Sequence, residues 1–403
     1  MSIATTRYIT SGGKDLSSVF MPLSFGAQYP TATGYRLSSG ADLNTVFCSK
    51  YSTTVVPNTS LLLSNNQDLS DIFDGYHPTG FSNMGSGLNS WVATVFTLDP
   101  SNVYISGTFT NAGTIGTRIT RWDGTQFNSF GNTALNSVVR MTHAFDTSNV
   151  YIGGEFTNAI SIGYRITRWD GTKFNGLGTT QFLNNSVYSV YAHDSSNVFV
   201  GGIFTNGGTI GSYVTRWDGS QFLSLGTTQL NGAVWRIDAS DLSNVYIAGS
   251  FSNGGTIGSY VTRWDGTKFN SLGTTQLNGA VRAMHVLDPS NIYIGGSFSN
   301  GGTIGSYVTR WDGTQYRALG ATLNSTVYGI YAYDLSNVYI GGQFGSAGTG
   351  YNITKWNGSS YNILGANGYP TVVYDLYKID PSNICIAANA SITLSFNINK
   401  YLI

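Results

Sequence analysis

The stretch NGGTIGSYVTRWDG occurs three times without a change, at residues 206–219, 253–266 and 300–313. The three copies begin 47 residues apart in a chain of 403 residues. Self-similarity at a period of 20–50 residues is typical of repeat architectures, in which each unit packs against its neighbours. The residues around these copies therefore indicate the fold.

Two short motifs extend the repeat in both directions. A Thr-Arg-Trp-Asp-Gly motif recurs in six units, and its last copy has drifted to Thr-Lys-Trp-Asn-Gly at residues 354–358. A Ser-Asn pair followed by Val or Ile, an aromatic residue and Ile or Val recurs seven times, with Cys385 at the aromatic place of the last copy. Its asparagines are Asn102, Asn149, Asn197, Asn244, Asn291, Asn337 and Asn383. The spacing of 46 to 48 residues makes each unit the size of one small β-sheet.

Each unit divides into four short strands. In the third unit we expect strands at residues 187–194, 197–204, 213–219 and 221–226. The glycine-rich stretch 205–212 is expected to be a loop, and Asp218-Gly219 is a strong hairpin signal. Gly, Asn and Thr recur too often for a helix, and no 3.6-residue period is present.

A four-stranded antiparallel sheet repeated at this period predicts an all-β fold, a seven-bladed β-propeller. One such sheet cannot bury both of its faces, whereas a closed ring lets each sheet cover the next. The seventh unit ends with residues 398–403, where its third strand belongs, and its fourth strand is missing. Residues 80–95 match 269–284 in type, so we expect the N-terminal strand Phe81–Gly85 to close the last blade. The propeller would then span residues 73–403.

The repeat also resembles a known family. The pattern VYIGGxFTNAGTIGxxITRWDGTxFxxLG resembles the propeller repeats of Rax2-type cortical marker proteins and related bacterial surface proteins, and more loosely those of kelch propellers. The resemblance covers residues 80–403 and rests on residues that serve folding: glycines for tight bends, Trp for packing between blades, and Asp-Gly for a turn. It implies a fold and leaves the function open.

The first 72 residues contain a different repeat. Asp-Leu-x-x-x-Phe begins at residues 15, 42 and 68, so three units of about 26 residues follow one another. We expect each unit to be a short strand, a turn and a one-turn helix capped by the Asp. Three such units cannot form much core, so we expect them to dock on another surface. The candidate docking anchors are Leu16, Phe20, Leu43, Phe47, Leu69 and Phe73.

The Asp-Leu-Ser-x-x-Phe motif resembles segments of structural proteins of large DNA viruses and tailed phages. The composition agrees with such a role, because 20 basic and 20 acidic residues cancel and only 10% of residues are charged. A chain without basic excess is not suited to neutralise phosphates, so we expect no nucleic-acid partner. We also expect no secretory leader and no membrane span, because no apolar run is long enough for either.

The search for catalytic and metal-binding residues gives no candidate. Cys48 and Cys385 form neither a disulfide framework nor a zinc site, and no His, Cys and Asp cluster has ligand spacing. Glu155 is the only glutamate, which excludes a glutamate acid–base pair. His143 and His285 share one position, six residues before the repeated Asn, and the other units carry aromatic residues or Asp238 there. We interpret this as a packing or channel-lining position, and we expect no cofactor and no enzymatic activity.

Variation between the units concentrates at the start of the first strand, nine residues before the repeated Asn. Large aromatic residues and arginines gather there, and such residues are typical of interfaces and carbohydrate platforms. Packing between blades is the alternative interpretation. The first unit carries Ala93 at this position, and the candidate interaction ring is Arg140, Tyr188, Trp235, Arg282, Tyr328 and Tyr374.

These patterns favour a non-enzymatic structural or assembly protein. In this hypothesis residues 1–72 bind other structural proteins or a second copy of the chain, and the propeller presents its loops within a virion. The alternative is a propeller that binds a glycan or a surface receptor, at the cell surface or outside the cell after export by a non-classical route. Near-identical blades favour a repeated binding surface over catalysis, because catalysis needs one asymmetric group of residues.

Overall fold

The computed structural model describes residues 81–84, 87–131, 133–158, 161–178, 181–346, 350–364, 371–380, 383–388 and 398–402. The chain divides into two units, Met1–Tyr76 and His77–Ile403. The whole first unit lies outside the described residues. The N-terminal segment 1–72 and its six candidate anchors therefore remain predictions.

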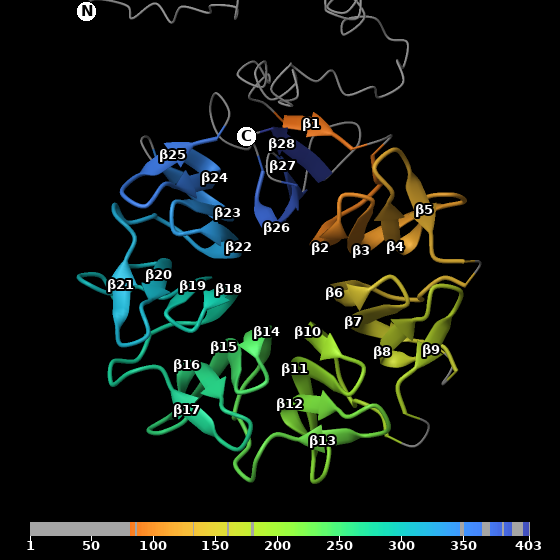
Figure 1. Ribbon diagram of the computed structural model, residues 1–403, viewed down its shortest axis with the longest axis horizontal. Coiled ribbons are helices and arrows are strands. Elements are labelled where there is room, and N and C mark those ends of the chain that lie inside the picture. Colours follow the sequence, from red (N-terminus) through yellow and green to blue (C-terminus); the bar gives the residue numbers. More distant parts are fainter. Residues whose placement is uncertain are drawn as a thin grey trace, which may run out of the picture. The chain divides into compact units, whose positions relative to one another are not determined.

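The described residues form seven four-stranded antiparallel sheets, arranged as blades around a common axis (Figure 1). Six of them each use four consecutive strands. Blade 1 has β2 (Val92–Asp99), β3 (Asn102–Ala112), β4 (Gly116–Trp122) and β5 (Phe127–Ser129). Blade 2 has β6 (Val139–Asp146), β7 (Asn149–Thr157), β8 (Tyr164–Trp169) and β9 (Phe174–Gly176). Blade 3 has β10 (Val187–Asp194), β11 (Asn197–Gly207), β12 (Gly211–Trp217) and β13 (Phe222–Ser224).

The next three blades follow the same order. Blade 4 has β14 (Val234–Asp241), β15 (Asn244–Gly254), β16 (Gly258–Trp264) and β17 (Phe269–Ser271). Blade 5 has β18 (Val281–Asp288), β19 (Asn291–Gly296), β20 (Val308–Trp311) and β21 (Tyr316–Ala318). Blade 6 has β22 (Val327–Asp334), β23 (Asn337–Ser346), β24 (Gly350–Trp356) and β25 (Tyr361–Ile363).

The remaining sheet, blade 7, joins both ends of the propeller region. It has β26 (Val373–Asp380), β27 (Asn383–Ala388), β28 (Ile398–Leu402) and β1 (Phe81–Asn83). β1 pairs with β28 in the register Phe81↔Tyr401, which is the pairing that the match between residues 80–95 and 269–284 predicts. Only six blades are therefore continuous in the sequence, and the ring closes through a sheet that the two ends share.

The repeated polar residues hold the tight turns. In blade 3, Asp194 Oδ1 accepts hydrogen bonds from the Ser196 amide at 2.7 Å and from Asn197 Nδ2 at 3.1 Å. Asn197 Oδ1 in turn accepts one from Arg216 Nη1 at 3.4 Å. In the other turn, Asp218 Oδ1 accepts bonds from two following amides, which lower the pKa of this carboxyl to about 2. The repeated Asp before the Ser-Asn pair and the repeated Asp of Trp-Asp-Gly thus both stabilise turns.

The core lies between neighbouring blades. One cluster packs Met141 and Tyr151 of blade 2 against Val187, Val200 and other residues of blade 3. Paired glycines in the second strand of blades 2, 3, 5 and 6 permit this contact, and they are not at tight bends as we expected. A Cβ added to Gly201 would lie 2.3 Å from a side-chain carbon of Val234 in the next blade. The first glycine of such a pair thus leaves room for a valine of the next blade.

The repeated Trp packs across the same seam. The six-membered ring of Trp264 in blade 4 lies against Gly226, which follows the last strand of blade 3 and has a φ of 66°. A Cβ at Gly226 would approach this ring to 3.1 Å. The prediction that this Trp packs between blades is therefore confirmed, and the Gly after the last strand makes room for it.

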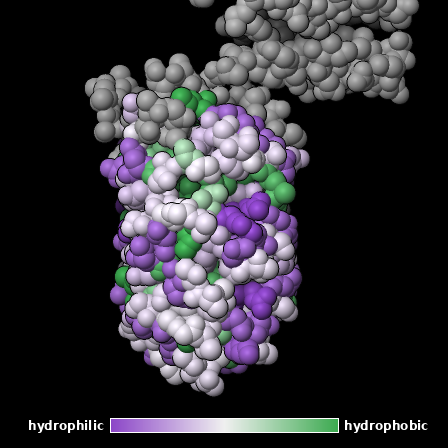
Figure 2. Space-filling view, turned by 90° about the vertical axis from the view of Figure 1, so that its left-hand side faces the viewer, coloured by the Kyte–Doolittle hydropathy of each residue, from purple (hydrophilic) through white to green (hydrophobic). Residues whose placement is uncertain are grey.

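The glycine-rich stretch 205–212 differs from the expected loop. β11 continues to Gly207 and β12 starts at Gly211, and after a register shift Thr205 pairs with Ser212. The second hairpin of the blade is thus longer than the sequence indicates, because glycine tolerates the bulged backbone. On the edge of the ring seen in Figure 2, hydrophobic residues form small separate groups among hydrophilic and near-neutral ones.

Candidate functional site

A β-bulge lies at the start of the first strand of every blade. In blade 3 the register passes from Val187↔Gly202 to Ser189↔Gly201, so Tyr188 is the extra residue. Bulges re-aim a side chain and are frequent beside binding sites. The seven bulged residues are Ala93, Arg140, Tyr188, Trp235, Arg282, Tyr328 and Tyr374. These are the residues nine before the repeated Asn, and their side chains line a pocket at the axis.

All six residues of the candidate ring line one pocket, together with residues of blade 1. The pocket has a volume of about 240 Å³ and receives residues from all seven blades, so it lies on the axis. We call it the axial pocket. Its seven-residue rim, the mouth ring, consists of Trp91, Arg140, Tyr188, Trp235, Arg282, Tyr328 and Tyr374. Every member of the mouth ring is half-buried.

Neighbouring members of the mouth ring touch one another around the whole circle. The Arg140 guanidinium lies 5.1 Å from the ring of Trp91 and 5.5 Å from that of Tyr188. Tyr188 meets Trp235 at 4.7 Å between ring centroids. Arg282 lies 5.0 Å from Trp235 and 5.9 Å from Tyr328. Tyr374 closes the circle, at 5.8 Å from Tyr328 and 5.4 Å from Trp91. Each cation is thus held between two aromatic faces.

Trp91 is the member that the sequence reasoning missed. Blade 1 carries Ala93 at the bulge, which is too small to reach its neighbours, and Trp91 two residues earlier takes its place in the ring. The sequence does carry a sign of this replacement: Trp91 stands two residues before Ala93, the one small residue at a position where the other blades have large side chains. A comparison restricted to one column of the repeat could not find it.

A buried ion pair forms the floor of the axial pocket. Arg236 Nη2 of blade 4 lies 3.0 Å from Asp375 Oδ1 of blade 7, and the Asp375 side chain is 2% exposed. Asp375 Oδ2 also accepts hydrogen bonds from the Thr94 hydroxyl at 2.7 Å and the Val95 amide at 3.3 Å. Arg236 Nη1 contacts Met141 Sδ at 3.4 Å. Neither charged residue was singled out from the sequence.

After the mouth ring and the ion pair at the floor, a third layer of side chains lies further along the first strand of each blade. It is formed by the residues six before the repeated Asn: Phe96, His143, Tyr191, Asp238, His285, Tyr331 and Tyr377. The ring of His143 lies 4.5 Å from Phe96 and 4.8 Å from Tyr191. The layer therefore closes the axis with packed rings, which confirms the packing interpretation of this position.

Burial shifts the acid–base behaviour of this layer. It lowers the pKa of His143 and of His285 to about 3, and the positive charge of Arg236 acts in the same direction. Burial raises the pKa of Asp238 to about 6, although the carboxylate accepts hydrogen bonds from the Val286 and Ala239 amides. Both histidines are neutral at pH 7, and Asp238 carries its charge against a desolvation cost.

Within the described ranges, no group of three or more His, Cys, Asp and Glu side chains is placed to hold a metal ion. In the same part of the chain, no helix has the length and hydrophobicity needed to cross a membrane. Of the charged groups at the axis, Arg140 pairs with Glu155 and Arg236 with Asp375. The chemistry open to the mouth ring is therefore recognition through aromatic, cationic and hydrogen-bonding contacts.

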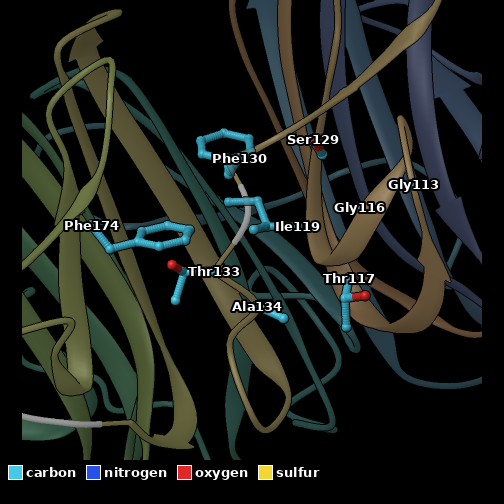
Figure 3. A pocket seen from close by; sticks show the side chains of 10 residues that line it. Gly113, Gly116, Thr117, Ile119, Ser129, Phe130, Thr133, Ala134 and Phe174 are labelled. Carbon is cyan, nitrogen blue, oxygen red and sulfur yellow. The ribbon is translucent and has the colours of Figure 1, made fainter.

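A second pocket lies between blades 1 and 2, away from the axis (Figure 3). It has a volume of about 290 Å³, and Thr117, Phe130, Ala134 and Phe174 are among its lining residues. Ala134 is equivalent to Gln229, which lies between blades 3 and 4. In both cases the backbone carbonyl accepts a hydrogen bond from an asparagine side chain of the next blade.

A glutamine closes the equivalent space at two other seams, between blades 3 and 4 and between blades 4 and 5. Gln276 Oε1 accepts a hydrogen bond from the Ser259 amide at 2.6 Å, and Gln229 makes the same bond to Ser212. The residue of blade 1 equivalent to Ser259 is Thr117, beside Ala134 in the pocket. The second pocket therefore exists because a small residue replaces a glutamine.

We expect Ala134→Gln to fill the second pocket and to raise the free energy of unfolding by about 1 kcal/mol, the typical net value of one hydrogen bond. Urea unfolding followed by tryptophan fluorescence measures the change. The matched control, Gln276→Ala, removes the same bond and should lower the free energy of unfolding by a similar amount. A loss of stability in Ala134→Gln would show that the pocket is not an unfilled glutamine site.

Comparisons with known proteins bear on the fold. No protein-family model matches the sequence, and a search of curated proteins gives no match. The resemblance to Rax2-type and kelch repeats and that of the N-terminal motif to viral and phage proteins therefore stay predictions.

Solved structures with a similar fold are β-propellers. The WD40 propeller domain of Doa1 superposes with a TM-score of 0.51 at 14% identity, covering 80% of this chain and 95% of that domain. YCF48 bound to D1 peptide gives 0.52 at 13% identity, covering 86% and 100%. YCF48 from Cyanidioschyzon merolae gives 0.53 at 10% identity, covering 80% and 98%. At such identities the likeness shows the fold alone: this chain contains a β-propeller of four-stranded blades.

Proposed function

We propose that this protein is a non-enzymatic interaction scaffold that binds a segment of a partner protein at the mouth ring. The observation that carries the proposal is the closed circle of five aromatic residues and two arginines around the axial pocket. Trp, Tyr and Arg are the residues that most often dominate binding energy at protein interfaces. One solved propeller of the same fold, YCF48, is described as bound to a peptide, and this agrees with the proposal by analogy only.

The packing of the mouth ring favours a protein partner over a glycan. Carbohydrate platforms offer an open aromatic face, on which a sugar ring lies. Here Trp235 is flanked by Arg282 at 5.0 Å and by Tyr188 at 4.7 Å, and Trp91 is flanked by Arg140 and Tyr374. Because other mouth-ring side chains already lie against these tryptophan rings, a ligand would contact ring edges and polar groups of the mouth ring. We keep glycan binding as the competing outcome of the test.

The test is an array of twelve-residue peptides probed with the full-length protein and with Trp235→Ala. The variant removes one side chain of the mouth ring, and we expect at least a tenfold loss of affinity for the selected peptides. Tyr351→Ala is the matched control, because Tyr351 is a 50% exposed aromatic residue of β24 that does not line the axial pocket. The proposal fails if no peptide binds, or if Trp235→Ala binds as well as the control.

The finer assignment concerns the assembly to which the scaffold belongs. We propose that residues 1–72 dock the protein on a larger structural assembly, a virion, through the leucine and phenylalanine of the Asp-Leu-x-x-x-Phe repeats. The support is the sequence pattern and the nearly uncharged composition. Native mass measurements of the full chain beside a chain that begins at Phe73 test the docking role. Equal oligomeric states of both chains would remove its basis.

A further inference from the structure

The mouth ring repeats one pattern twice. Going around the circle, Trp91, Arg140 and Tyr188 are followed by Trp235, Arg282 and Tyr328, and Tyr374 then closes the ring. In both halves a guanidinium lies between a tryptophan and a tyrosine, at 5.0 to 5.9 Å from the ring centroids. The two arginines therefore have the same aromatic surroundings.

The two arginines differ in their counter-ion. Arg140 donates from Nε and Nη2 to Glu155 Oε1, at 2.9 and 2.5 Å. The equivalent residue of blade 5 is Ser297: the Glu155 amide bonds to the Val138 carbonyl, and the Ser297 amide bonds to the Ala280 carbonyl in the same way. The Ser297 hydroxyl carries no charge, and it donates a hydrogen bond to the Ala280 carbonyl at 3.4 Å. Glu155 is the only glutamate of the chain, so this compensation occurs once.

Arg282 is consequently the one uncompensated charge of the axial pocket. The Arg140 charge is balanced by Glu155 and the Arg236 charge by Asp375. Among the described residues, no ion pair or hydrogen bond involves Arg282, whose contacts are the faces of Trp235 and Tyr328. A guanidinium presents a rigid fork of donors that matches a carboxylate with two parallel hydrogen bonds. The aromatic walls hold this fork in place before any ligand arrives.

We propose that Arg282 binds the carboxylate of an aspartate or glutamate side chain in the partner segment. This inference rests on the proposed function, because it assigns the chemistry of a segment bound at the mouth ring. Arg282 belongs to the mouth ring at the rim of the axial pocket, whereas the floor is formed by Arg236 and Asp375. A peptide segment that crosses the mouth ring presents side chains to Arg282. A chain end that enters along the axis would contact the floor instead. The occupant is therefore an acidic peptide.

The chain supplies its own matched test. Ser297→Glu places beside Arg282 the same residue that neutralises Arg140, and Ser297→Gln adds a similar volume without charge. Peptides on the array are acetylated and amidated, so that their only carboxylates are side chains. We expect the selected peptides to be rich in Asp and Glu and to lose at least tenfold in affinity with Ser297→Glu. Ser297→Gln should keep most of the affinity.

A second comparison isolates the charge contact. The tightest peptide and its analogue with Asn or Gln in place of the acidic residue are titrated into both proteins by calorimetry. We expect Ser297→Glu to weaken the acidic peptide and to leave the neutral analogue unchanged, as a double-mutant cycle requires for a direct contact. Glu155→Ser should strengthen acidic peptides, because it frees the second guanidinium.

Each failure has its own meaning. The carboxylate site is overturned if the selected peptides lack Asp and Glu, or if they bind Ser297→Glu with unchanged affinity. The proposed function still stands in that case if Trp235→Ala weakens binding at least tenfold. Binding that requires a free C-terminal carboxylate, or that appears only with acidic sugars on a glycan array, overturns the acidic side chain as the occupant. If Trp235→Ala has no effect on any ligand, the proposed function itself fails.

Discussion

Asp375→Ala is expected to lower the free energy of unfolding by about 3–5 kcal/mol, the usual cost of removing one partner of a buried ion pair. The Arg236 guanidinium would remain at the floor of the axial pocket without its counter-charge 3.0 Å away. The Thr94 hydroxyl and the Val95 amide would lose an acceptor at the same time. Urea unfolding followed by tryptophan fluorescence measures the loss.

The size of this effect follows from what the carboxylate connects. Asp375 lies on β26 of blade 7, Arg236 on β14 of blade 4, and Thr94 on β2 of blade 1. Blade 7 is the sheet that the two ends of the propeller region share, so its contact with blade 1 is the seam at which the ring closes. One side chain therefore ties this seam to a blade across the axis.

Two controls separate the charge pair from its surroundings. Thr94→Val removes one hydrogen bond to Asp375 and should cost about 1 kcal/mol. Arg236→Met combined with Asp375→Leu removes both charges at similar volume, and we expect it to be more stable than Asp375→Ala, because no charge is left buried alone. A double variant as unstable as Asp375→Ala would show that the effect comes from packing at the seam.

The repeat made most of the fold predictable. Each blade is specified by motifs such as Asp-x-Ser-Asn and Trp-Asp-Gly, whose hydrogen bonds act within a few residues along the chain. The pairing of β1 with β28 was also visible, because residues 80–95 match the end of an ordinary unit. The extended hairpin at 205–212 was not, because glycine-rich sequence looks the same in a loop and in a bulged strand.

The site was predictable only where all blades share a rule. The column of residues nine before the repeated Asn gave six members of the mouth ring, whereas Trp91 lies outside that column. The pair of Arg236 and Asp375 joins residues 139 apart, and no local spacing announces it. Arg282 lacks a counter-ion in the described part of the chain, because its blade carries Ser297 where blade 2 carries Glu155. This difference between the blades can be interpreted only after the structure shows that Glu155 pairs with Arg140.

The two histidines of the third layer are expected to make the propeller sensitive to acid. Their pKa in the folded protein is about 3, and the pKa of histidine in an unfolded chain is about 6.5. Between these values the unfolded chain binds more protons, so stability is fully present above about pH 6.5 and decreases as the pH falls toward 3. At pH 5 the two values imply a loss of about 2 kcal/mol for each histidine.

The neighbouring carboxyl works in the opposite direction. The folded pKa of Asp238, about 6, is higher than its unfolded value, so the folded state takes up a proton first as the pH falls below 6. This offsets about 1 kcal/mol of the histidine loss at pH 5. Tyr191, Tyr331 and Tyr377 face the same region, and their raised pKa keeps them neutral throughout this range. A net loss of about 3 kcal/mol between pH 7 and pH 5 remains.

Other blades supply the replacements that test this assignment. Phe96 and Tyr331 hold the histidine position in blades 1 and 6, so His143→Phe with His285→Phe puts a residue type there that the layer already accommodates. With Asp238 still in place, the double variant should gain about 1 kcal/mol between pH 7 and pH 5 in urea titrations, and Asp238→Asn should steepen the loss of the parent. His143 Nδ1 accepts the Ala192 amide at 3.2 Å, so protonation there would set two N–H groups against each other. If the double variant keeps the full acid sensitivity, exposed carboxylates of the turns become its source, and the buried histidines do not carry it.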